Sequence, residues 1–217
     1  PRDSKQVTLF NPIDDEIMEV MAKGVEIGER DFRGLVIHHQ GEHFSAGANL
    51  LMVLEGIHAN QWAAIDEMIR RFQDLNTGLR KAQIPVVTAP FAYTFGGGCE
   101  ITMGGDRVCA AAETYIGLVE VGVGLIPAGG GCRFMIERVL EGVDEPVLSN
   151  LPFIRTAFEN IGMAKVATSG EEARDRKFLR PSDKVEINRD QQLWTAKRMA
   201  IGLAEESVDV VRGAAKL

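Results

Sequence analysis

The stretch YTFGGGCEITMGGD (residues 93–106) places three consecutive glycines directly before Cys99 and Glu100. The strand candidate IPVVTAPF (84–91) precedes it, and the apolar run after the glycines predicts a short helix from about Gly98. The glycines have two interpretations: a tight turn, or a place where a ligand touches the backbone with Glu100 directed at it. An amide at a helix N-terminus lacks an intrahelical partner and can bind an oxyanion.

A second loop of the same character is FSAGANL (44–50), which follows the short buried strand candidate GLVIHH (34–39). Its small residues permit close approach of a ligand to the backbone, and a single amide would be a weak oxyanion hole. Taken singly, each loop also fits an ordinary turn. Because both loops follow strands and enter helices, we expect two backbone amides to serve one ligand oxygen.

Glu100 and Glu120 are carboxylates in apolar, glycine-rich surroundings, the second within LVEVGVG (118–124). An ionised carboxylate in such surroundings is costly unless it is paired, protonated or used in chemistry. The alternative for Glu120 is a helix cap or a side chain turned to solvent. Two such carboxylates are what acid–base chemistry on a water molecule requires.

The sequence patterns of a nucleotide-binding site and of a serine nucleophile are incomplete. Neither triple glycine (96–98 and 129–131) ends in the Gly-Lys-Ser/Thr of a P-loop, and Gly122-x-Gly124 lacks the third glycine of a dinucleotide fingerprint. Ser45 has no histidine at a recognisable spacing, which argues against a serine nucleophile.

Composition narrows the class of protein further. The 217 residues carry 24 Lys+Arg and 31 Asp+Glu, a net charge of −7, which argues against nucleic-acid binding. The 3 cysteines form neither a disulfide framework nor a zinc pattern, and Cys99 is interpreted as a small buried residue. No apolar run is long enough for a membrane span and no secretory leader is visible, so we expect a cytoplasmic protein.

The 4 histidines do not suggest a metal site. His38 and His39 are expected to point to opposite faces of a strand, so they cannot share one ion. His43 and His58 are interpreted as structural with them, and we expect no metal.

The order of elements predicts an α/β core with a helical appendage. Residues 7–10 are expected to form the end of a strand, and Asn11 is the expected N-cap of a helix with Pro12 at its first position. The remaining expected elements are an apolar stripe at Ile13, Ile17, Val20, Met21 and Val25, a long amphipathic helix from Trp62 to Leu79, the strands DRVCAA and TYIGL, a helix after residues 129–131, and a mostly helical region from about Asn150 with KVEIN (184–188) as its one strand candidate.

Three motifs together resemble one known group of enzymes. HFSAGANL (43–50), FGGGCEITMGGD (95–106) and VEVGVGLIPAGGG (119–131) are similar, in order and spacing, to the enoyl-CoA hydratase/isomerase (crotonase) superfamily. The likeness covers residues 7–140 well and continues weakly beyond. The crotonase-like half of bacterial 3-hydroxyacyl-CoA dehydrogenase fusion proteins looks most similar.

The resemblance implies a crotonase-like spiral of β-β-α units over residues 1–140, followed by a mainly helical region, 141–217. By position, it implies that Glu100 activates water, that Glu120 protonates the α-carbon, and that the amides of Ala48 and Gly97 form the oxyanion hole. It further implies that Ala46, Asn49, Leu50 and Leu51 contact the CoA substrate. Asn49 departs from the aspartate of many relatives, which keeps a hydrogen bond and drops a charge.

The implied reaction is the hydration of trans-2-enoyl-CoA to 3-hydroxyacyl-CoA in fatty acid β-oxidation. Isomerisation or another acyl-CoA reaction at the same site is the alternative, followed by a non-catalytic binding module. Neither metal nor redox cofactor is expected within this chain. The expected partners are the acyl-CoA substrate and either further copies in a trimer or a dehydrogenase domain.

The resemblance also leads us to expect that the chain is part of a longer, two-activity polypeptide. It begins at Pro1 rather than at a methionine, and single-domain relatives have further strands before the first helix. NAD would then bind to a dehydrogenase domain outside these residues.

Overall fold

The described chain begins with a helix that starts later than the sequence predicts. The computed structural model describes residues 11–143 and 150–206. Helix α1 (Asp15–Asp31) is capped by Asp14, whose carboxylate accepts a 2.9 Å hydrogen bond from Ile17 N. The predicted cap at Asn11 is wrong because Asn11 has φ 43° instead of the extended backbone of a cap. Its side-chain amide instead donates a hydrogen bond to Phe44 O at 2.8 Å.

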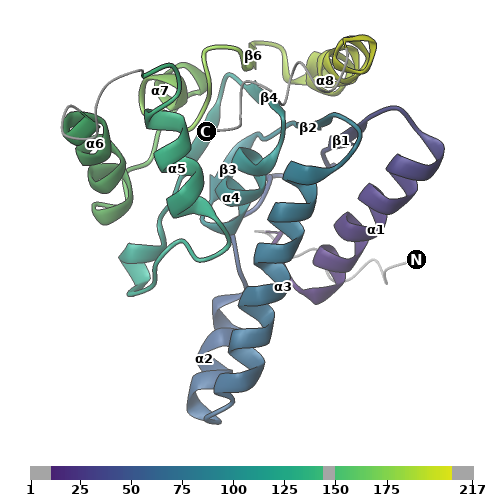
Figure 1. Ribbon diagram of the computed structural model, residues 1–217. Helices are drawn as coiled ribbons and strands as arrows, with labels where there is room; N and C mark the ends of the chain where they lie inside the picture. Colours follow the sequence, from purple (N-terminus) through teal and green to yellow (C-terminus); the bar gives the residue numbers. More distant parts are fainter. Residues whose placement is uncertain (1–10, 144–149, 207–217) are drawn as a thin grey trace.

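The strands form two parallel sheets, and from the second strand onward they belong alternately to the larger and the smaller sheet (Figure 1). The four-stranded sheet has the order β1-β2-β4-β6, and the two-stranded sheet pairs β3 with β5. The strands are β1 (Leu35–Ile37), β2 (Val86–Thr88), β3 (Ala92–Phe95), β4 (Arg107–Ala111), β5 (Thr114–Gly117) and β6 (Lys184–Glu186). The helices after α1 are α2 (Leu50–His58), α3 (Trp62–Lys81), α4 (Gly97–Gly104), the 3-10 helix η1 (Glu120–Val123), α5 (Gly131–Val139), α6 (Leu151–Gly162), α7 (Gly170–Asp175) and α8 (Arg189–Glu205).

The order of these elements repeats a β-β-α unit. In β2-β3-α4 and again in β4-β5-η1-α5, the first strand belongs to the larger sheet and the second to the smaller one. The unit after β1 is abbreviated, because Ser45 makes a parallel bridge to Thr94 of β3 before α2 begins. The second strands therefore end side by side, and the segments that follow them emerge at one edge.

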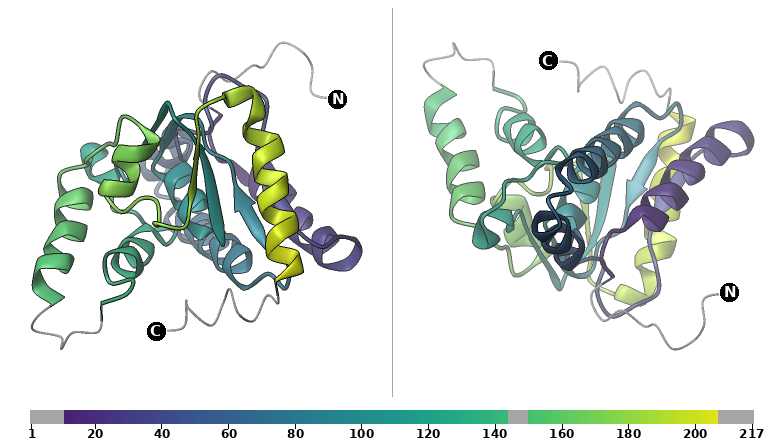
Figure 2. Two further views of the ribbon diagram at one scale, coloured as in Figure 1. Left: turned by 90° about the horizontal axis from the view of Figure 1, so that it is seen from above. Right: turned by 90° about the horizontal axis from the view of Figure 1, so that it is seen from below.

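The larger sheet is covered on both faces, as Val86 and Val87 on β2 show. Val86 packs with Leu79, Ile84 and the other residues of one core cluster under α1 and α3, while Val87 packs with Ala196 and Ala200 of α8. Successive strand residues point to opposite faces, so α8 lies on the face opposite α1 and α3 (Figure 2).

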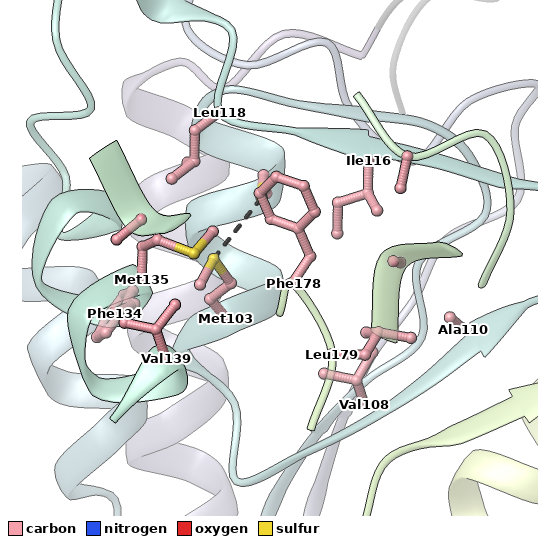
Figure 3. Close-up of a cluster of buried hydrophobic side chains, with 14 residues drawn as sticks. Met103, Val108, Ala110, Ile116, Leu118, Phe134, Met135, Val139, Phe178 and Leu179 are labelled. Atoms are coloured by element: carbon pink, nitrogen blue, oxygen red, sulfur yellow. Dashed lines mark hydrogen bonds between the residues drawn. The ribbon is translucent and has the colours of Figure 1, made fainter. Parts of the chain in front are cut away.

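A third core cluster fills the space between α4, α5 and the segment after α7. Met103 of α4, Met135 of α5 and Phe178 meet there, beside Ile116 and Leu118, and all are buried (Figure 3). Cys99 lies in this cluster with its sulfur 3.8 Å from that of Met103, which confirms it as a small buried residue. The cluster fixes α4 and α5 relative to each other.

The C-terminal region contributes to the larger sheet as well as covering it. β6 pairs with β4 in parallel, with Cys109 opposite Lys184, which confirms the KVEIN strand. The division of the chain at residues 140 and 141 stays a prediction.

Several expected elements differ in detail. β1 ends at Ile37, so His38 and His39 follow the strand rather than lying on it. Val20 (66% exposed) and Trp62 (58% exposed) lie outside the buried faces of their helices, because α1 buries only the stripe that meets β1 and α3, and α3 only the stripe that meets the neighbouring helices. β3 was not predicted, since its four residues merge with the preceding proline-bounded strand candidate. The strand end expected at 7–10 lies outside the described residues.

Within residues 11–143 and 150–206, no helix is long and apolar enough to cross a bilayer.

Candidate active site

The triple glycine 96–98 forms the turn between β3 and α4. Gly96 has φ 51°, a conformation that favours glycine, and a Cβ there would lie 3.2 Å from Oε1 of Glu120. Gly97 is the first residue of α4, where an N–H has no intrahelical partner. The turn therefore presents an amide at the positive end of α4, beside the carboxylate of Glu120.

The FSAGANL loop lies directly against this turn. Gly47 has φ 94°, and a Cβ on it would lie 3.0 Å from both Gly97 N and Phe95 O. Ser45 joins the two segments, because its amide donates to Tyr93 O at 3.0 Å and its carbonyl accepts from Phe95 N at 2.9 Å. The backbone around Ala48 is thus held next to Gly97.

Ser45 also shapes the loop itself. Its hydroxyl accepts a 3.1 Å hydrogen bond from Gly47 N, immediately before Ala48, and Ser45 is buried. Outside the helix and sheet ladders of the described residues, neither Ala48 N nor Gly97 N donates to a backbone carbonyl or a side chain. The assignment of Ala48 N and Gly97 N as paired oxyanion donors stays a prediction.

Glu100 is held by the second triple glycine. Its side chain comes from the first turn of α4 and is 2% exposed, and Oε1 accepts a 2.8 Å hydrogen bond from Gly131 N. A Cβ on Gly129 would lie 2.7 Å from Glu100 Oε2, and one on Gly131 would lie 3.0 Å from Oε1. Residues 129–131 therefore form a cradle for this carboxylate, at the N-terminus of α5.

Sequence reasoning missed this role of residues 129–131. The stretch lacks the P-loop pattern, although its place before a helix predicts an anion site. The anion is a side chain of the same protein, 31 residues earlier, and no local pattern identifies it.

Glu120 begins η1, shortly after β5 ends at Gly117. Both of its carboxylate oxygens are buried and have no hydrogen-bond partner among the described residues. Since buried polar atoms are nearly always hydrogen-bonded, such a carboxylate is expected where a polar ligand or water is bound. Both alternative interpretations of Glu120 are wrong: Val119 rather than Glu120 is the N-cap of η1, and the carboxylate oxygens of Glu120 are buried instead of turned to solvent.

The two carboxylates have similar electrostatics. Burial, with the nearby charge of Glu120, raises the pKa of Glu100 from 4.5 to about 7, against the opposing hydrogen bonds of residues 129–131. Burial raises the pKa of Glu120 from 4.5 to about 7. Near neutral pH, the pair can therefore hold one proton and one negative charge, as an acid and a base acting together must.

The expected CoA contacts lie on the α2 side of the loop. Asn49 is the N-cap of α2, and its side-chain oxygen accepts from Met52 N at 3.4 Å, so asparagine makes a capping contact here. Ala46 is half-buried, whereas Leu50 and Leu51 are exposed. Their contacts with CoA stay predictions.

The histidine rings near the loop form hydrogen bonds with backbone carbonyls. The ring of His38 pairs with Ala89 O at 3.2 Å, and that of His39 pairs with Phe44 O at 2.8 Å. Among the described residues, no group of His, Cys, Asp or Glu has the arrangement of a metal site.

Comparison with known proteins identifies the family of this chain. The family described as enoyl-CoA hydratase/isomerase matches residues 5–144. A probable 3-hydroxyacyl-CoA dehydrogenase of Bacillus subtilis (strain 168) is 40% identical over 193 residues, 89% of this chain and 24% of that protein. A probable enoyl-CoA hydratase of the same organism is 27% identical over 133 residues, covering 58% of this chain and 50% of that protein.

Solved structures of other proteins share this fold. The crystal structure of an enoyl-CoA hydratase from Polaromonas sp. JS666 superposes with a TM-score of 0.74 at 20% identity, covering 96% of this chain and 78% of that one. The spiral of β-β-α units is thus a crotonase-like α/β fold, as the resemblance implied. The chain belongs to the enoyl-CoA hydratase/isomerase family of enzymes, and it spans half or less of the two curated relatives.

Proposed function

We propose that this chain adds water to the double bond of a trans-2-enoyl-CoA and releases a 3-hydroxyacyl-CoA. The observation that carries this proposal is the pair of buried carboxylates, Glu100 and Glu120, beside the glycine turn, both with the pKa raised to about 7. Hydration needs a base for the water and an acid for carbon, and isomerisation needs only one group that moves a proton.

The backbone amides supply the electrostatic part of the proposed reaction. The thioester oxygen accepts hydrogen bonds from Ala48 N and Gly97 N and gains negative charge as the enolate forms. Both amides then bind it more tightly than in the ground state, which lowers the barrier. The N-terminal end of α4 adds a favourable dipole at the same oxygen.

The carboxylates supply the proton transfers. Glu100 accepts a proton from water as the water oxygen bonds to the β-carbon, and Glu120 donates its proton to the α-carbon. The hydroxyl and hydrogen added to the substrate sum to one water, and the enzyme regains its starting state when the proton passes from Glu100 to Glu120. No step in this scheme transfers electrons to or from a cofactor.

Loss of absorbance of crotonyl-CoA with formation of 3-hydroxybutyryl-CoA tests this reaction directly. We expect turnover by the wild-type chain and none with a 3-enoyl-CoA. Conversion of the 3-enoyl thioester without hydration of crotonyl-CoA would instead assign the isomerase alternative.

Calorimetry tests the ligand class, since acyl-CoA should bind and the corresponding free acid should not.

We further propose that the chain is the hydratase part of a longer polypeptide that also carries 3-hydroxyacyl-CoA dehydrogenase activity. The 40% identical relative has that name, and this chain matches 24% of its length. NAD would bind to the dehydrogenase part, which would oxidise the product of hydration. The parent reading frame tests this: an adjoining segment with a complete dinucleotide fingerprint is expected, and a frame limited to these residues would contradict it.

A further inference from the structure

A buried ion pair joins Arg138 of α5 to Asp183. Nη1 of Arg138 is 3.2 Å from Oδ2 of Asp183, and their side chains are 2% and 0% exposed. Taking two charges out of water is costly, and a buried pair is often no better for stability than apolar residues of similar volume. Stability alone is therefore a weak explanation for this pair, and its other contacts are informative.

Arg138 joins α5 to the end of α4. Its Nη2 donates to Met103 O at 3.2 Å, in the last turn of α4, where carbonyls lack intrahelical partners and the dipole favours a cation. The hydrogen bond from Gly131 N to Glu100 joins the same two helices at the other end. Two cross-links thus fix α5 on α4, one at Glu100 and one about 10 Å further along α5.

Asp183 anchors this frame to the sheet. Its Oδ1 accepts from Val108 N of β4 at 2.9 Å, and its Oδ2 accepts from Arg180 N at 2.6 Å. Arg138 Nη1 also donates to Phe178 O at 3.1 Å. The pair therefore ties α4, α5, β4 and the segment 178–183 together at one buried point.

We propose that Arg138 and Asp183 are a positioning pair for catalysis, which holds α5 so that the Gly131 amide stays on the Glu100 carboxylate. The proposal rests on the proposed hydratase function. Neither side chain touches the reacting atoms. The effect passes along α5, because a helix transmits a shift at one end to the other, and displacements of about 1 Å at a catalytic group can cost about a hundredfold in rate.

The test uses Arg138→Lys, which keeps a basic side chain but cannot reach three acceptors with the geometry of a guanidinium. The matched control is Arg133→Lys, the same change on the same helix, because Arg133 pairs with Glu137 and is 65% exposed. In the folded Arg138 variant, we expect kcat for crotonyl-CoA to fall about ten- to a hundredfold with KM within a few-fold. The control should keep both constants.

A titration without substrate separates positioning from the proposed function. The Gly131 hydrogen bond lowers the pKa of Glu100, so weakening it should move the ¹³C NMR titration of the Glu100 carboxyl to higher pH. We expect this shift in Arg138→Lys and not in Arg133→Lys. Should the wild-type chain fail to hydrate crotonyl-CoA, the proposed function fails while the titration still decides the positioning role.

Asp183→Asn provides the second variant if Arg138→Lys does not fold. Asparagine keeps an acceptor for Val108 N and loses the charge that orients Arg138, and the same fall in kcat and the same NMR shift are expected. A folded variant of either residue with wild-type kcat and an unmoved Glu100 titration would overturn the proposal.

Discussion

Gly131 N donates a 2.8 Å hydrogen bond to Oε1 of Glu100, across 31 residues of sequence. The donor is at the N-terminus of α5 and the acceptor is in the first turn of α4, so the two helices that follow the smaller sheet meet at the carboxylate. This bond favours the ionised form of Glu100, while burial and the charge of Glu120 favour the protonated form. The balance keeps the pKa of Glu100 near neutrality, where it can exchange a proton.

Removing either carboxylate should abolish most hydration. Glu100→Gln and Glu120→Gln keep the side-chain volume and remove the acid–base group, so each should lower kcat by about two to four orders of magnitude. Steady-state kinetics with crotonyl-CoA measure this, and acyl-CoA affinity by calorimetry should change little. A variant that retains its rate within a few-fold would remove that glutamate from the mechanism.

Removing the amide of Ala48 should reduce the rate without removing a side chain. Ala48→Pro deletes one N–H, and we expect a fall in kcat of about 10²- to 10³-fold, typical of an oxyanion-hole donor. Ala63→Pro is the matched control, because residue 63 is in the first turn of α3, where proline is tolerated. Equal rates for the two variants would rule out Ala48 as a donor.

Adding a methyl group to the cradle should displace Glu100. In Gly131→Ala, the new Cβ would lie 2.7 Å from Leu118 Cδ2 and 3.0 Å from Glu100 Oε1, so the carboxylate or α5 must move. A fall in kcat of at least tenfold is expected. Gly78→Ala is the control, since a Cβ there meets nothing within 4 Å. It should leave kcat unchanged and add about 0.4–1 kcal/mol to the free energy of unfolding.

The raised carboxylate pKa values predict how stability depends on pH. Both glutamates have a folded pKa of about 7 against an ordinary value of 4.5, so the folded protein binds more protons than the unfolded chain between these values. The two glutamates therefore lower the free energy of unfolding as pH rises. The decrease begins near pH 4.5, is complete above about pH 7 and amounts to up to about 3 kcal/mol per group.

Urea unfolding of wild type and of the Glu100→Gln, Glu120→Gln double variant measures this loss. The variant should gain stability relative to wild type as pH rises from about 5 to 8, because glutamine does not ionise. A stability difference that stays constant with pH would show that the two carboxylates are not shifted.

Much of the fold and part of the site could be predicted from local patterns. The glycine turn before Glu100 and the helix after it were evident because glycine, an apolar run and a helix start are encoded within a few residues. The start of α1 was misplaced because Asn11 and Asp14 are both capping residues, and only the backbone conformation selects Asp14. The strand β3 is not evident from the sequence because its four residues merge with the proline-bounded strand candidate before it, and only its pairing with β5 makes it a separate strand.

The sequence by itself determined which groups can carry the chemistry: two carboxylates in apolar surroundings, and two glycine-containing loops that enter helices. Tertiary structure alone decided how they meet. It set Gly47 against Gly97, enclosed Glu100 with residues 129–131, and left both oxygens of Glu120 buried without a partner in the described part of the chain. Residue type and turn geometry depend on neighbours in the chain, whereas burial, and with it the pKa of each carboxylate, depends on segments that only folding brings together.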